Sequence, residues 1–90
     1  MTNPTLTIAV MAYNSELYVE QAALGAFSQT YRPLEIILSD DCSVDSTFEI
    51  MQRMAARYQG PHRIVVNRNT RNVGVSGHIN RIMEISSGQL

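Results

Sequence analysis

Two adjacent carboxylates, Asp40 and Asp41, directly follow the largely apolar run Leu34–Ser39. Carboxylates in such a position are costly unless they meet hydrogen-bond donors, a cation or a ligand. In one interpretation they tie the turn and cap the following helix through short bonds to backbone N–H groups. In the other, Asp41 accepts a hydrogen from an N–H-bearing ligand edge, such as the imide of a pyrimidine. Both can hold together, with Asp40 and Asp45 serving the turn while Asp41 faces outward.

Tyr13 follows the apolar alternation of residues 6–11, at the end of another predicted strand. A tyrosine at this place is either a partly buried loop aromatic or a platform on which a nucleobase stacks, an interaction worth about 1–3 kcal/mol. If the strands that end near Tyr13 and Asp41 are neighbours, an aromatic face and a carboxylate stand together. A pyrimidine base needs both of these groups.

Three strands position these side chains. Period-two alternation predicts the first strand at residues 6–11, and the unbroken Ile-Ile-Leu run predicts a second at 34–39 that is buried on both faces. A shorter β-branched segment predicts the third at 63–67. The carboxyl end of each predicted strand therefore leads into a polar segment.

The helices between and after the strands are predicted from capping residues and from apolar side chains at helical spacing. For the first helix these are a start at Asn14 or Ser15, Glu16 in the first turn, and a buried stripe of Val19, Ala22, Ala23, Ala26 and Phe27. The second helix is predicted to start at Asp45 and Ser46, with Ser46 and Glu49 as a capping-box pair, and to stop at Gly60–Pro61. Its predicted buried face consists of Phe48, Met51, Ala55 and Tyr58. The third follows Gly74, buries Ile79, Ile82, Met83 and Ser86, and fades at Gly88.

The order of elements is therefore βαβαβα, which predicts an α/β fold. Strands joined by helical connections run parallel, so the expected architecture is a three-layer α/β/α sandwich around a short, three-stranded parallel sheet. Ligands on such sheets bind outside the carboxyl ends of the strands. Those ends are the segments 11–14 and 40–43 and the residues from Asn67 onward, where the unusual polar residues gather.

Length and composition describe a single small globular domain. The chain has 90 residues, a formal charge of −1 and 44% hydrophobic residues, which excludes a disordered or repetitive chain. The near-neutral charge argues against a nucleic-acid partner, and no apolar run approaches the length of a membrane span. Cys42 is the one cysteine, so no internal disulfide forms and a reducing, cytoplasmic setting is expected.

Four motifs in order resemble the N-terminal half of a family 2 glycosyltransferase. They are Tyr13-Asn14, Gln29-Thr30-Tyr31, the segment Asp40-Asp41-Cys42-Ser43-Val44-Asp45-Ser46-Thr47, and Asn72-Val73-Gly74 followed by Asn80. The resemblance covers nearly all of the chain at the spacing typical of that family. It implies a truncated GT-A fold with a Rossmann-like sheet, in which residues 1–90 form the nucleotide-sugar-binding half of the domain.

The resemblance also implies a function, the transfer of a sugar from a UDP- or dTDP-linked donor to a glycan or glycoconjugate, with inversion. Tyr13 is then expected to stack on the base and Asp41 to accept its imide hydrogen. The same pocket is expected to be shaped by Asp40, by the backbone near Met11 and Ala12, and by Gly74, where the chain passes close to the nucleotide. Cell-surface polysaccharide assembly at the cytosolic face of a membrane is the expected setting of the longer protein.

Three positions depart from the family pattern. Cys42 replaces a glycine, so it is strained if that position needs a positive φ. Met11-Ala12 stands where Pro-Thr or Pro-Ser is common, which removes a hydroxyl near the base. His78-Ile79-Asn80 replaces Ala-Arg-Asn, and His78 is expected to be a solvated or capping histidine.

The resemblance places the catalytic machinery after Leu90, in an Asp-x-Asp motif that holds a divalent cation and in a later acidic general base. We therefore assign no catalytic and no metal-binding residue to this chain, and we expect Mg²⁺ or Mn²⁺ only in a longer enzyme. The chain alone is expected to be inactive. Its first strand is expected to be an open edge of the sheet, through which the chain forms a homo-oligomer.

Two other functions remain open from the sequence. The first is a non-catalytic α/β module that uses the same scaffold for protein contacts. The second is a phosphoacceptor receiver domain, which also carries paired acids at a strand end; it is disfavoured because Asn67 stands where a further aspartate is needed.

Overall fold

The central strand of the sheet is buried along its whole length. In the computed structural model, which describes residues 4–90, β2 (Leu34–Asp40) lies between β1 (Leu6–Ala12) and β3 (Arg63–Arg68), and all three run parallel. All seven residues of β2 are buried, as the Ile-Ile-Leu run predicted. A strand covered on both faces needs a layer of helices on each side of the sheet.

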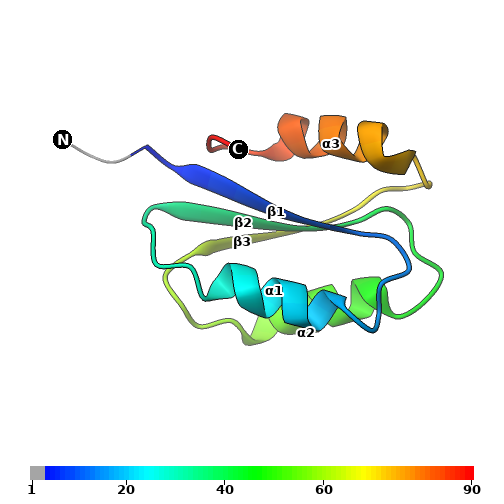
Figure 1. The fold of residues 1–90 in the computed structure, drawn as a ribbon, viewed down its shortest axis with the longest axis horizontal. Helices are drawn as coiled ribbons and strands as arrows, with labels where there is room; N and C mark the ends of the chain where they lie inside the picture. The colour runs from blue at the N-terminus through cyan, green and yellow to red at the C-terminus, as the bar shows by residue number, and fades with distance from the viewer. Residues whose placement is uncertain (1–3) are drawn as a thin grey trace.

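Helices provide both of those layers. The helices α1 (Val19–Phe27) and α2 (Thr47–Arg57) lie on one face of the sheet, and α3 (Gly74–Ile85) lies on the other (Figure 1). The side chains at the centre of the core are those of Val19, Ala23, Ala26, Ile36, Leu38 and Met51. The predicted α/β/α sandwich and the order of its elements are confirmed.

The first helix starts later than predicted. Asn14 adopts a positive φ of 49°, and the chain makes one turn in which Tyr18 and Val19 both donate to the Ser15 carbonyl before α1 begins. Glu16 is therefore outside the first turn of α1, and its carboxylate instead accepts the Ser46 N–H at 2.9 Å. Ala22 is exposed, while Ala23 and Ala26 are buried as predicted.

The capping box predicted for the second helix is absent. The Ser46 side chain makes no capping hydrogen bond at the start of α2. Asp45 takes that role, because its Oδ1 accepts the Thr47 N–H at 2.9 Å and the Thr47 hydroxyl at 2.5 Å. The aspartate side chain is one carbon longer than that of serine, so it reaches the free N–H of Thr47 from one residue farther back than Ser46.

The third helix turns a different face to the sheet than predicted. His78 and Ile82, which are four residues apart, are its buried residues, whereas Ile79 and Met83 are 42% and 60% exposed. The helix ends at Ile85, before Gly88. Hydrogen bonds to Asp41 at its start and to Glu35 just after its end hold α3 in this orientation.

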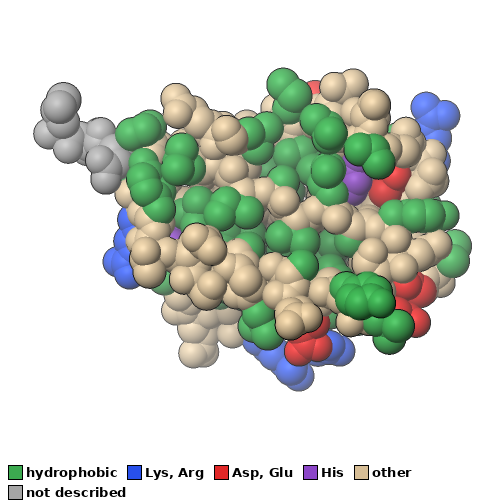
Figure 2. Space-filling view, viewed as in Figure 1, with side chains coloured by type: hydrophobic (Ala, Val, Ile, Leu, Met, Phe, Trp, Pro, Cys, Tyr) green, Lys and Arg blue, Asp and Glu red, His purple; other side chains and the backbone are tan. Residues whose placement is uncertain are grey.

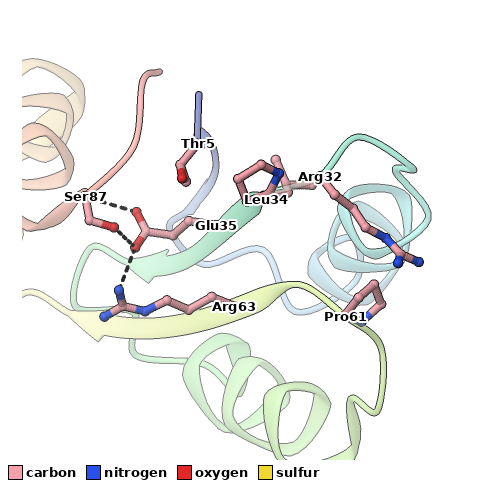
Figure 3. Close-up of a pocket in the computed structure, with 8 residues that line it drawn as sticks. Thr5, Arg32, Leu34, Glu35, Pro61, Arg63 and Ser87 are labelled. Carbon is pink, nitrogen blue, oxygen red and sulfur yellow. Dashed lines mark hydrogen bonds and ion pairs between the residues drawn. The ribbon is translucent and has the colours of Figure 1, made fainter. Parts of the chain in front are cut away.

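A buried carboxylate ties the chain after α3 to the amino end of the sheet. Glu35, in β2, is 1% exposed and accepts hydrogen bonds from the Thr7 hydroxyl at 3.1 Å, the Ser87 N–H at 2.9 Å and the Ser87 hydroxyl at 2.7 Å. Arg63 of β3 lies 3.6 Å from the same carboxylate (Figure 3). Burial alone would raise the pKa of Glu35, but the bonds from Ser87 and Thr7 and the Arg63 charge outweigh it and lower the pKa.

The edge of β1 is partly covered. Gln89 bridges Leu6 in the parallel sense: its N–H donates to the Thr5 carbonyl, and its carbonyl accepts the Thr7 N–H. The expectation of a fully open edge is therefore wrong at its first residues. Within residues 4–90, no strand pairs with the outer side of β1 beyond Thr7.

We expect Gly88→Ala to lower the free energy of unfolding by about 1–3 kcal/mol, the usual cost of overpacking. A Cβ at position 88 would lie 2.6 Å from the Thr7 hydroxyl oxygen and 3.0 Å from the Thr5 carbonyl oxygen, so the Gln89 bridge would have to shift. Urea unfolding followed by circular dichroism measures the change.

Gly25→Ala is the matched control. A Cβ at Gly25, inside α1, meets nothing within 4 Å, so we expect this change to raise stability by about 0.5–1 kcal/mol. Equal effects of the two substitutions would contradict the close packing described for Gly88.

Candidate functional site

A cavity of about 310 Å³ lies at the carboxyl end of the sheet, where ligands are expected on a parallel α/β fold. Five of the six residues predicted for a nucleotide site line it: Met11, Ala12, Tyr13, Asp41 and Gly74. Its other lining residues are Ser15, Asn72, Val75 and His78. The neighbouring strands β1 and β2 thus bring Tyr13 and Asp41 to one opening.

A larger cavity of about 550 Å³ lies at the opposite end of the sheet, beside Glu35, Arg63 and Ser87 (Figure 3). The buried carboxylate at its wall has four partners within this chain, and Figure 3 shows Ser87 and Arg63 directed at it. Its chemistry is accounted for by folding, so we place the candidate site at the carboxyl end.

Asp40 does not reach the candidate cavity. It is fully buried, and its carboxylate accepts the Ser43 N–H at 2.9 Å and the Ser43 hydroxyl. Arg68, whose Nε lies 3.6 Å from the same carboxylate, also donates to the Ser43 carbonyl at 3.1 Å. Asp40 therefore serves the turn, as one of the two interpretations of the paired acids predicted.

The Asp41 side chain does not face outward as predicted. It is 3% exposed, and its Oδ1 accepts Asn69 Nδ2 at 2.8 Å and the Val73 N–H at 3.0 Å. Its Oδ2 accepts Asn72 Nδ2 and the Gly74 N–H, both at 3.0 Å. These four donors fill the four lone-pair positions of a carboxylate. Asp41 thereby caps α3 as well as lining the cavity.

The electrostatics of Asp41 follow from these bonds. Burial alone would raise the pKa of Asp41, but the hydrogen bonds from Asn69 and from the backbone of Val73 and Gly74 outweigh it and hold the pKa below its ordinary value. The side chain is therefore an anion at neutral pH, at the wall of the cavity.

Hydrogen bonds between two loops hold Tyr13 at the mouth of the cavity. Asn14 donates its N–H to the Ser43 hydroxyl at 2.7 Å and accepts the Val44 N–H on its side chain at 3.0 Å. The Ser15 N–H donates to the Thr47 hydroxyl at 2.8 Å. Tyr13 is 49% exposed and lines the cavity, so part of the residue is accessible to a ligand there.

The strain expected at Cys42 is present. Its φ is 63°, in the left-handed region that glycine adopts without cost. The chain turns sharply here, between the buried carboxylate of Asp41 and the hydroxyl of Ser43, which bonds both Asp40 and Asn14.

His78 is a lining residue that the sequence did not place in the site. It is 4% exposed, so the expectation of a solvated or capping histidine is wrong. Its Nε2 lies 2.6 Å from the hydroxyl of Ser39, near the end of β2. Burial lowers the pKa of His78, although the negative charges of Asp41 and Asp40 oppose that effect. The helical spacing of His78 and Ile82 is the signal that marks this face of α3 as buried.

The acids around the site do not suit a divalent cation. Asp40 and Asp41 are occupied by the donors given above, and Asp45 accepts bonds from Thr47 and from the Glu16 N–H. Within residues 4–90, no group of three or more histidine, cysteine, aspartate or glutamate side chains is placed to hold a metal ion.

A sequence profile described as "Glycosyl transferase family 2" matches residues 7–90, nearly the whole chain. The chain belongs to this glycosyltransferase family. The family resemblance seen in the four motifs is thus confirmed.

Several proteins are similar in sequence to the family 2 chain, and two of those described below are named as glycosyltransferases. A UDP-Glc:α-D-GlcNAc-diphosphoundecaprenol β-1,3-glucosyltransferase of Escherichia coli is 31% identical over 84 residues, which cover 93% of this chain and 32% of that protein. A putative teichuronic acid biosynthesis glycosyltransferase of Bacillus subtilis is 28% identical over 91 residues, covering 99% of this chain and 35% of that protein. An uncharacterised Mycobacterium tuberculosis protein is 32% identical over 85 residues, covering 93% of this chain and 24% of that protein.

A solved structure has the same fold. A mannosyltransferase from Pyrobaculum calidifontis, in complex with GDP-Man and Mn²⁺, aligns with a TM-score of 0.86 at 22% identity, over 97% of this chain and 26% of the mannosyltransferase chain. The family 2 chain therefore spans about a quarter to a third of the length of the relatives it matches. None of its described helices has the length and apolar character needed to cross a membrane.

We expect Asp41→Asn to lower the free energy of unfolding by about 2–4 kcal/mol at pH 7, because an amide leaves buried donors of the cap without an acceptor. The difference from the wild type should shrink in acid. A carboxylate whose folded pKa is lowered stabilises above its unfolded pKa, and that contribution is lost as the pH falls through the folded value. Urea unfolding at a series of pH values measures both effects.

Glu49→Gln is the control for this change, since Glu49 is an exposed acid of α2. We expect its effect to stay within about 0.5 kcal/mol. An Asp41→Asn variant as stable as Glu49→Gln would show that the four bonds do not hold α3.

Proposed function

We propose that this chain provides the nucleotide-binding part of an inverting glycosyltransferase, which transfers a sugar from a UDP- or dTDP-sugar to a glycan or glycoconjugate. Family membership supports sugar transfer as the class of reaction. The observation that carries the finer proposal is that Tyr13 and Asp41 line a single cavity at the carboxyl end of β1 and β2. A partly exposed aromatic residue beside a buried carboxylate suits a flat base that carries an N–H group.

In this proposal the base stacks on Tyr13 and its imide N–H binds Asp41. The lone pairs of Asp41 are occupied, so a ligand has to replace one donor. Asn72 is the donor most easily replaced, because its side chain is exposed whereas the Val73 and Gly74 N–H groups belong to the start of α3. The imide N–H then takes the position of Asn72 Nδ2 on Oδ2 of Asp41.

The remaining predicted residues shape the pocket. Gly74 has a φ of 78°, and a Cβ there would meet nothing within 4 Å, so open space for a ligand lies beside its backbone. Met11 and Ala12 form the apolar wall under the base. Asp40 acts indirectly in this proposal, by holding the turn that carries Asp41.

The relatives support the type of donor and the setting. The Escherichia coli relative is named for a UDP-Glc donor and a diphosphoundecaprenol acceptor, and the Bacillus subtilis relative for teichuronic acid biosynthesis. The structural neighbour was solved with a nucleotide-sugar and Mn²⁺. We infer that a longer protein containing this chain uses a divalent cation and assembles cell-surface polysaccharide at the cytosolic face of a membrane.

The isolated chain should bind a nucleotide weakly. One base stack contributes about 1–3 kcal/mol, and one hydrogen bond to a charged group about 1.5–3 kcal/mol. The loss of translational and rotational freedom on binding costs at least about 4 kcal/mol. We therefore propose that residues 1–90 alone bind UDP with millimolar affinity or weaker and do not turn over.

We expect UDP to shift the NMR signals of residues at the cavity, with a Kd that is millimolar or weaker. Tyr13→Ala should weaken binding by about 5- to 100-fold through loss of the stack, and Tyr13→Phe should bind within about twofold of the wild type because the ring remains. Titration of each variant by ¹H–¹⁵N spectroscopy measures the Kd.

Tyr18→Ala is the control, since Tyr18 is 70% exposed and lies outside the cavity lining. It should bind UDP as the wild type does. UDP-induced shifts confined to other parts of the chain, or a low-micromolar Kd, would contradict the proposal.

We also propose that the chain self-associates through the free part of the β1 edge. The backbone groups of successive residues in β1 point alternately toward β2 and toward the outer edge. Leu6 and Ala12 bond on the β2 side, whereas Thr7 bonds Gln89 on the outer side. By this alternation Ala9 and Met11 also present their backbone groups at the outer edge. Met11 is 42% exposed as well.

Sedimentation at high concentration should show a dimer or larger oligomer. Ala9→Pro removes an outward N–H without breaking a bond to β2, so it should shift the chain to a monomer. A wild-type chain that sediments as a monomer at the highest concentration would contradict self-association.

A further inference from the structure

His78 is a buried histidine that lines the candidate nucleotide cavity and has one ring nitrogen without a hydrogen-bond partner among the described residues. The residue lines that cavity together with Asp41 and Tyr13, while its Nε2 is held by Ser39 on the sheet side. Among the described residues, the one buried side-chain nitrogen or oxygen without a partner is Nδ1 of His62. The Nδ1 of His78 has no hydrogen-bond partner among the described residues and is not one of the buried unpartnered atoms, so it keeps some exposure to solvent. Because His78 is otherwise buried and lines the cavity, the geometry points to the cavity as the side from which Nδ1 is exposed. Figure 2 shows a histidine and an acidic side chain next to each other beneath α3 on the face in view.

Hydrogen-bond counting assigns the tautomer of this ring. The Ser39 hydroxyl is completely buried and already accepts Asn67 Nδ2 at 2.9 Å. If Nε2 of His78 also donated to it, the Ser39 proton would be left without an acceptor in the interior. The Ser39 hydroxyl therefore donates to Nε2, which leaves the hydrogen of a neutral ring on Nδ1.

The charge state agrees with this arrangement. Burial lowers the pKa of His78, and the acids that oppose this, Asp41 and Asp40, are themselves bonded to other groups. At neutral pH the ring is thus a neutral group with one N–H, oriented by Ser39 and directed into the cavity. A site that holds an N–H donor in a fixed orientation rejects a ligand that cannot accept from it, because the donor is then left unpaired.

We propose that His78 is a specificity-determining residue that reads the base: its Nδ1–H donates to a ring carbonyl oxygen adjacent to the N–H that Asp41 accepts. This inference rests on the proposed nucleotide function. The pair of groups fits the lactam edge of uracil or thymine, where a carbonyl adjoins an N–H. Cytosine offers the opposite pattern, an acceptor nitrogen beside an amino group, so it places a lone pair against Asp41 and a donor against His78.

The decisive measurement compares UDP with CDP. We expect the wild-type chain to bind UDP at least about tenfold more tightly than CDP, since a mismatched buried donor and acceptor typically cost more than that factor. His78→Phe, which keeps an aromatic ring and removes the donor, should weaken UDP binding about 5- to 10-fold. It should not weaken CDP binding, because it removes the donor that opposes the cytosine amino group. His78→Asn, which can still donate from its amide, should recover part of the preference.

A second measurement does not depend on any variant folding. Nitrogen-15 spectra of the imidazole in the wild-type chain should show the Nδ1–H tautomer of His78, and UDP should shift the Nδ1 resonance while CDP shifts it little. An Nε2–H tautomer, or a Nδ1 resonance insensitive to UDP, would overturn the inference. Ser39→Ala should increase the fraction of the other tautomer and reduce the preference for UDP over CDP.

The outcomes separate the two proposals. If UDP binds in a Tyr13-dependent manner but the ratio of UDP to CDP affinity is the same in the wild type and in His78→Phe, the role of His78 is wrong and the nucleotide function stands. If UDP produces no shift at the cavity of the wild-type chain, both proposals fail.

Discussion

The carboxylate of Asp41 is the interaction on which the site depends. It sits at the end of the buried central strand and accepts four donors, from Asn69 after β3, from Asn72, and from the first backbone N–H groups of α3. Without an acceptor at that point, the start of α3 would be an unsatisfied helix terminus facing the sheet. One side chain therefore joins β2, the chain after β3 and α3, and it closes one wall of the cavity in doing so.

The opposite end of the same helix is held in a similar way. Glu35, near the start of β2, accepts the Ser87 N–H and hydroxyl just after α3, whereas Asp41 directly follows the other end of that strand. A helix fastened at both ends by buried carboxylates at opposite ends of one strand has little freedom to rotate or slide. That rigidity explains why His78 and Ile82, and not the more hydrophobic Ile79 and Met83, face the sheet. It also means that the wall of the cavity is formed before any ligand arrives, which lowers the ordering cost of binding.

The sequence was sufficient where local pattern and topology decide the outcome. The Ile-Ile-Leu run predicted a doubly covered strand, and parallel topology then brought Tyr13 and Asp41 to one opening. The sequence was insufficient where hydrogen bonds between distant segments determine where a helix starts or how a side chain is oriented. The Asn14 side chain accepts the N–H of Val44, thirty residues away, instead of capping the following helix, and α1 begins only at Val19. The orientation of Asp41 depends on donors in the loop after β3, and no periodicity in the sequence reports on those bonds. The burial of His78 against Ser39 is signalled only by its helical spacing to Ile82, which competes with the apolar pair Ile79 and Met83.

The bridge between Leu6 and Gln89 fixes a direction as well as a contact. Paired parallel strands run in the same direction. A polypeptide that continued past Leu90 in this register would therefore run along β1 toward the carboxyl end of the sheet, where Tyr13 lies. The step from Leu6 to Ala12 is six residues, and the same step from Gln89 would deliver a side chain opposite Ala12, at the lip of the cavity. Gly88 lies against Thr7 without room for a Cβ, so the absence of a side chain there allows Gln89 to pair with Leu6 and thereby sets the register of this edge.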